Sequence, residues 1–291
     1  MSRSSNTLRN VASVDEFLNA AATETVPLFE YLEFEFLLEY DVFAPARRGR
    51  TRDHEPPELM RGFLHCYYKD IYGIRPVERE LRNTIVWLSC GFDRPPSRDA
   101  VDRFLTDLEH VVDEVFDHLV EQAARRGLLN LTYCIDSTDV RAMPADQDAS
   151  KCYDPTDDEY YYGYGCTIVS TGQKIPIAAE FTESKQAPEE TAMRVTRDAL
   201  AVKQPIWVED RITEHSEDVQ LKQSTLDETY NRRSGVERTN ESVKNCGLGR
   251  THARGRVHAR AQVFLALCLR LVVAITNYER GDNPGSTIIT V

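Results

Sequence analysis

Four polar residues of one stretch, Tyr230, Arg233, Glu237 and Lys244, have the types and the spacing that chemistry on a phosphate needs. Their steps of three, four and seven residues return to nearly the same side of an α-helix. One helical face would therefore present a phenol, a guanidinium, a carboxylate and an ammonium. The carboxylate could hold a metal ion while the cations bind phosphate oxygens. A solvated helix face with i,i+4 ion pairs has the same spacing, so spacing alone leaves both interpretations open.

A second candidate for metal binding ends an apolar run. Residues 128–136 read Leu-Leu-Asn-Leu-Thr-Tyr-Cys-Ile-Asp, which predicts a strand that ends at Asp136, before Ser137 and Thr138. Asp139 is a rival. Residues three apart on a strand face opposite sides, so the two aspartates cannot share a site unless the strand ends between them.

Together these two elements resemble insertion-sequence transposases of the haloarchaeal type, which have an Asp-Asp-Glu (DDE) catalytic triad. The helical face matches the Y-(2)-R-(3)-E-(6)-K signature of that family at all four positions. The Asp-Ser-Thr after the apolar run is similar to the end of the family's first catalytic strand. The resemblance covers most of the chain. An unrelated Mg²⁺ nuclease of the same fold would lack the Tyr-Arg-Glu-Lys face.

The resemblance implies a DNA transposase that cleaves element ends and joins a 3′-hydroxyl to target DNA. Such phosphoryl transfer uses two divalent ions, and Mg²⁺ (or Mn²⁺) prefers carboxylate ligands. The match to the family gives Asp136, rather than Asp139, the first carboxylate position and Glu237 the third, both as metal ligands. The implied partners are the terminal inverted repeats of the element and target DNA, bound by a homodimer.

The second aspartate of the triad has no clear counterpart. The family usually follows its fourth strand with a motif like Gly-Asp-x-x-Tyr-Asp, whereas here the expected strand 205–208 runs straight into Glu209 and Asp210. We therefore predict an internal deletion near residues 208–210, with Asp210 or Glu209 as the local substitute. The alternative function is a catalytically defective, transposase-derived protein that still binds DNA.

The positive charge of this acidic chain is concentrated around Glu237. A net charge of -12 over 291 residues does not suit a general nucleic-acid binder, whose affinity comes from neutralising phosphates. Residues 232–260, however, hold eight Arg and Lys residues against Glu237 and Glu241 only. The alternative for this basic segment is a solvated surface. We expect DNA contacts from Tyr230, Arg233, Lys244, Arg250, Arg254 and Arg256.

The order of predicted elements indicates an α/β protein with two domains. Residues 1–126 are expected to form an all-helical, DNA-binding domain, as a bundle or a helix-turn-helix, whose last long helix starts after Ser97 and runs to Arg125. Residues 127–291 are expected to form an RNase H-like catalytic domain, a mixed sheet with flanking helices, truncated near 208–210. Its strands are predicted at 128–136, 160–170, 174–182 and 205–208, with a helix from Pro188.

Cysteine usage and hydropathy indicate a cytoplasmic protein with no membrane segment. The seven cysteines are scattered and form no C-x-x-C pair, which favours free thiols in a reducing cytoplasm over disulfides or a zinc ribbon. The apolar run 263–275 contains Arg270 and is too short to span a membrane, so it predicts a buried core helix.

Overall fold

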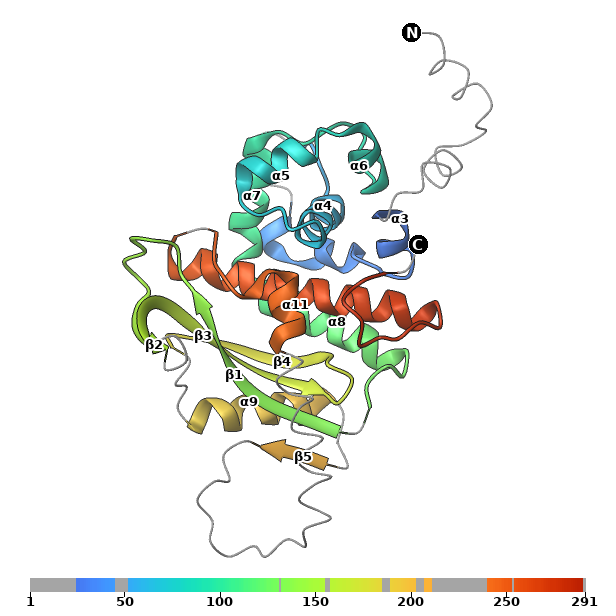
Figure 1. The fold of residues 1–291 in the computed structure, drawn as a ribbon. Helices are drawn as coiled ribbons and strands as arrows, with labels where there is room; N and C mark the ends of the chain where they lie inside the picture. The colour runs from blue at the N-terminus through green and yellow to red at the C-terminus, as the bar shows by residue number, and fades with distance from the viewer. Residues whose placement is uncertain are drawn as a thin grey trace, which may run out of the picture. The chain divides into compact units, whose positions relative to one another are not determined.

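The structure is a computed structural model that describes residues 25–44, 52–130, 132–154, 158–184, 189–202, 207–210, 240–252 and 254–289. Contacts divide the chain into two compact units, Met1–Leu108 with Ile289–Val291, and Glu109–Ile288. Figure 1 shows the helices of the first unit and the sheet of the second.

The elements described in the first unit are all helical and surround a core of aromatic rings. Phe104 stacks on Phe43 with 5.5 Å between ring centroids and lies 5.6 Å from Phe63. A reciprocal capping box of Glu55 and Glu58 starts the central helix. The helices are α3 (Thr25–Phe29), η2 (Glu35–Glu39), η3 (Asp41–Phe43), α4 (Pro56–Tyr68), α5 (Ile74–Glu80), α6 (Thr84–Ser89) and α7 (Arg98–Leu108).

The prediction of one long helix from Ser97 to Arg125 is wrong, because the segment forms two helices, α7 and α8 (Val112–Arg125). Ser97 does cap α7, since its Oγ accepts a hydrogen bond from the Ala100 amide at 3.3 Å. The chain turns at Glu109, whose buried carboxylate contacts His258. A buried carboxylate needs a hydrogen-bonding partner, and the position of the turn places Glu109 next to His258. Because α8 packs in the second unit, the contacts divide the chain after Leu108, whereas the sequence places the domain boundary after residue 126.

A mixed five-stranded sheet forms the second unit, and together with the helices it confirms the predicted α/β class. The central strand β3 pairs antiparallel with β1 along one edge, while β2 and β4 share its other edge. β5 pairs parallel with the first residues of β1. The strands are β1 (Thr132–Arg141), β2 (Ser150–Asp154), β3 (Glu159–Thr171), β4 (Pro176–Thr182) and β5 (Trp207–Asp210). The sequence analysis did not predict β2, and β1 continues beyond its expected end at Asp136.

Helices α8, α9 (Glu189–Val202) and α11 (Arg256–Glu279) flank the sheet. Figure 1 shows α8 and α11 together on one side and α9 on the other. By length and composition α11 could cross a membrane, but 94% of its most apolar window is buried within the protein. It is therefore the core helix that the sequence predicts at residues 263–275.

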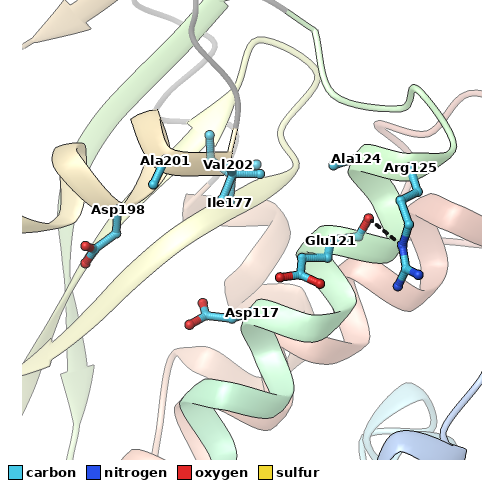
Figure 2. Close-up of a pocket in the computed structure, with 8 residues that line it drawn as sticks. All are labelled: Asp117, Glu121, Ala124, Arg125, Ile177, Asp198, Ala201 and Val202. Atoms are coloured by element: carbon cyan, nitrogen blue, oxygen red, sulfur yellow. Dashed lines mark hydrogen bonds between the residues drawn. The ribbon is translucent and has the colours of Figure 1, made fainter.

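An acidic pocket of about 560 Å³ opens between α8, α9 and β4 (Figure 2). Asp117 and Glu121 line it from α8, and Asp198 lines it from α9. Although Asp117 is exposed at the pocket wall, desolvation by the surrounding pocket, followed by the negative charges of Asp113, Asp198 and other carboxylates nearby, raises its pKa to about 6. The pocket concentrates negative charge and does not suit a DNA phosphate.

The raised pKa of Asp117 predicts a pH-dependent contribution to stability. Because the folded-state pKa lies above the ordinary value of 3.8, this carboxyl favours folding when protonated, and the effect is lost as the pH rises through about 6. Asp117→Asn should therefore unfold at higher urea concentration than the wild type at pH 7.5, and the difference should vanish near pH 4. Asp102→Asn, on the exposed side of α7, is the control. An equal urea midpoint for Asp117→Asn and the wild type at pH 7.5 would contradict the assignment.

Candidate functional site

Asp136 lies where strand β1 changes its neighbour. Along the edge of β1 away from β3, the described residues of β5 pair with residues 132–135, and Asp210 lies opposite Ile135. At Arg141 the same edge is taken by another segment: the Arg141 amide donates to the Gly249 carbonyl at 3.1 Å. Between these two pairings, no strand within the described ranges pairs with this edge of β1. The carboxyl ends of parallel strands are the usual place for ligand sites in such sheets.

Amide groups hold the Asp136 carboxylate. Its Oδ1 accepts from the backbone amide of Ser137 at 2.8 Å, and its Oδ2 accepts from Nδ2 of Asn240 at 2.7 Å. Asn240 lies in a helical segment of which the structure describes residues 240–243, and it follows Glu237 by three positions in the sequence. The chain immediately after the candidate glutamate therefore contacts the candidate aspartate directly.

Asp139 has a different partner from the same segment. Lys244 Nζ lies 3.4 Å from Asp139 Oδ1. Because β1 continues to Arg141 without ending between the two aspartates, Asp136 and Asp139 occupy alternate sides of the strand. Each still reaches residues 240–244, which run beside the open edge of β1.

The segment after Asn240 is anchored to the core helix. Arg270, fully buried in α11, donates from Nε to Ser242 Oγ at 3.3 Å and from Nη2 to the Pro284 carbonyl at 2.8 Å. Its Nη1 has no hydrogen-bond partner among the described residues, and burial lowers the pKa of Arg270 to about 10. The segment then forms a π-helical turn, η4 (Lys244–Leu248), in which Gly247 has a φ of 101°. Such irregular turns recur at functional sites.

The basic residues predicted to contact DNA, Arg250, Arg254 and Arg256, lie in different surroundings. Arg250 is exposed beside the end of β1, where its backbone forms an isolated bridge with Arg141. Arg256 starts α11 and pairs with Glu183 at 2.6 Å, while its backbone amide donates to Asp148. Arg254 precedes α11 by two residues. These three arginines therefore lie along the chain that leads from the end of β1 to the start of the core helix α11.

Part of the predicted site lies outside the described residues. Tyr230, Arg233 and Glu237 belong to this part, as does the side chain of Asp210, whose backbone ends β5. Among the residues that the structure does describe, no group of three or more His, Cys, Asp or Glu could hold a metal ion. Asn240 was missed by the sequence analysis. Its one available signal is the three-residue step from Glu237, which returns to the same helical side.

Known proteins match this chain over almost its full length. The family model of the Transposase DDE domain matches residues 129–211 and 196–272. Two relatives from Halobacterium salinarum, strains R1 and NRC-1, are each named "Probable transposase for insertion sequence element ISH11". Each is 78% identical over 326 aligned residues, which cover 98% of this chain and 99% of the relative. No solved structure matches.

The family match spans the strand that carries Asp136, the Asn240–Lys244 segment and most of α11. The relatives extend the similarity to nearly the whole chain. This protein belongs to the insertion-sequence transposases with a DDE domain.

Proposed function

We propose that this transposase performs metal-dependent cleavage at the ends of its element, followed by strand transfer to target DNA, in a centre built on Asp136 and Glu237. The hydrogen bond from Asn240 to Asp136 carries this proposal. On a helix that extends from residues 240–243 toward the N-terminus, Glu237 lies one turn before Asn240 and on the same side. Three residues correspond to a rise of about 4.5 Å, which keeps Glu237 within reach of Asp136.

The surroundings of Asp136 fit a divalent cation. Amide donors to both oxygens orient the carboxylate, whose oxygens are the hard ligands that Mg²⁺ prefers. Mg²⁺ or Mn²⁺ would supply Lewis-acid chemistry at the attacking and leaving oxygens. Asp136 and Glu237 would hold the metal, and Asn240 would act as a positioning residue for Asp136. Cations of the basic segment would bind phosphates on either side of the cleaved bond.

The topology of the sheet supports an RNase H-like catalytic domain. Its strands run in the order β4-β3-β1-β5, with the first three antiparallel and β5 parallel to β1. This order brings Asp136 on β1 beside the end of β5, where the second carboxylate of the family is expected. We further propose that the helical first unit contacts the terminal repeats and that a homodimer holds the two ends.

A specific observation favours a second candidate function, DNA binding without cleavage. The alignment with the relatives spans 326 positions, whereas this chain has 291 residues, so at least 35 aligned positions have no residue here. The family model also matches in two pieces, and these overlap at residues 196–211, which include β5. We infer an internal deletion near residues 208–210 that removed the segment with the second aspartate.

Two local carboxylates could take over the lost position. Along the parallel pair, Glu209 is in register with Cys134 and Asp210 is in register with Ile135. Both positions lie within two residues of Asp136 along the sheet. Whether one of them substitutes decides between the two candidate functions.

Cleavage of a duplex that carries an element end tests this choice. With Mg²⁺ or Mn²⁺, we expect cleavage to fall below detection in Asp136→Asn and Glu237→Gln, because each removes a metal ligand, and to persist in the control Asp139→Asn. Loss in Asp210→Asn or Glu209→Gln identifies the substitute carboxylate. DNA binding with no wild-type cleavage favours the second candidate function. Cleavage that survives Asp136→Asn would contradict the proposed centre.

Asn240→Ala tests the positioning role independently of turnover. Loss of a residue that orients a metal ligand typically weakens metal affinity about 10- to 100-fold, so we expect a shift of this size in Mn²⁺ binding by calorimetry. Asn245→Ala, an exposed asparagine of the same segment, is the matched control and should bind Mn²⁺ like the wild type. Equal affinities for Asn240→Ala and Asn245→Ala would exclude the positioning role.

A further inference from the structure

Arg270 is a buried cation in the middle of the apolar core helix α11. Its exposed fraction is 0%, and residues 261–278 contain no other Arg, Lys, Asp or Glu. Moving a charged group out of water costs free energy, so buried charges are normally paired with an opposite charge. A guanidinium in such a core therefore calls for a counter-charge.

The hydrogen-bond partners of Arg270 are neutral. Nε donates to Ser242 Oγ at 3.3 Å, and Nη2 donates to the Pro284 carbonyl at 2.8 Å. Nη1 is buried and has no hydrogen-bond partner among the described residues. A buried donor that lacks an acceptor is uncommon in native proteins, and it often marks the place of a bound water or ion. Nη1 is thus the atom of this side chain that can take a ligand.

No carboxylate compensates the charge within the described ranges, where Arg270 forms no ion pair. The acidic residues closest in sequence to its two partners are Glu241 and Asp282, and both are exposed. Burial lowers the pKa of Arg270 to about 10, and the neighbour that opposes this shift is the thiol of Cys246. The guanidinium therefore stays protonated and positively charged at neutral pH.

The chemistry of this site favours a small monovalent anion. A water molecule would accept the hydrogen bond of Nη1 but would leave the charge uncompensated. A divalent anion such as sulfate would exchange one excess positive charge for one excess negative charge, and its burial would cost more hydration. Chloride brings a single negative charge and accepts hydrogen bonds.

We infer that a chloride ion binds at Nη1 of Arg270, where α11 meets residues 242–246. The ion supplies the counter-charge of the buried guanidinium. Ser242 is bonded to the same guanidinium and follows Asn240 by two residues, so the anion site adjoins the segment that contacts Asp136. The inference does not depend on the proposed function.

Urea unfolding of the whole chain in sodium chloride and in sodium gluconate, at equal ionic strength, tests the site. An anion that binds only the folded state lowers the unfolding equilibrium constant in proportion to 1 + [Cl⁻]/Kd, about tenfold for each tenfold rise in chloride above the Kd. We therefore expect the urea midpoint of the wild type to rise as chloride replaces gluconate.

Two arginine variants separate this site from a general effect of salt. Arg270→Met removes the buried charge and keeps an unbranched side chain, so its urea midpoint should not respond to chloride. Arg280→Met is the matched control, because it removes an exposed arginine directly after α11, and it should respond like the wild type.

A crystal of the wild type grown in sodium bromide locates the ion without any variant, so the site can be tested even if Arg270→Met does not fold. Bromide is a monovalent anion similar to chloride, and its anomalous scattering identifies it. We expect an anomalous peak within hydrogen-bond distance of Nη1 of Arg270.

Three results would overturn the inference. The first is a wild-type urea midpoint that is equal in chloride and gluconate, and the second is an Arg270→Met midpoint that responds to chloride as the wild type does. The third is a bromide-soaked core without a peak at Arg270. If Cys246→Ala responds to chloride while the wild type does not, the counter-charge is the Cys246 thiolate and not an ion. Since none of these measurements uses DNA, each outcome leaves the proposed function standing.

Discussion

The backbone groups along the outer edge of β1 set the constraint on which the site depends. A strand buried in a sheet must pair its amides and carbonyls on both edges. In the part of the chain that the structure describes, β5 pairs with this edge as far as Ile135, while Gly249 and Thr251 pair with it at Arg141. This change of partner positions the chain before Gly249 beside Asp136 and Asp139. Asn240 and Lys244 contact β1 between these two pairings.

The core helix α11 holds that arrangement in place. Its Arg270 bonds Ser242, and its first turn lies beside Asp146, a buried carboxylate that accepts from Tyr164 at 3.0 Å and from the Gly255 amide at 3.1 Å. Burying the Arg270 guanidinium costs free energy unless it forms hydrogen bonds. Its bond to Ser242 therefore fixes the position of residues 240–243 against α11. The same helix contacts Glu109 through His258. The supports of the site are therefore buried polar contacts within a largely apolar core.

Sequence patterns within a short stretch of chain predicted the helices and strands that form through interactions between neighbouring residues. The apolar run of α11, the Ser97 cap and strands β3 and β4 follow from hydropathy, capping and turn residues near each other in the chain. Glu109, in the turn between α7 and α8, contacts His258, which is 149 residues away in the sequence, and no local pattern reports such a contact. Asn240 was missed for the same reason. The role proposed for Asp136 came from family resemblance, because an aspartate after an apolar run occurs in many strands.

The central claim is that Asp136 and Glu237 share a metal site that the Asn240 segment brings together. The most direct measurement is a crystal structure of the protein with Mn²⁺, whose anomalous scattering locates the ion. The account predicts an anomalous peak about 2.0–2.2 Å from carboxylate oxygens of both residues, beside the end of β5. A metal bound elsewhere, or Asp136 and Glu237 on opposite sides of the sheet, would contradict it.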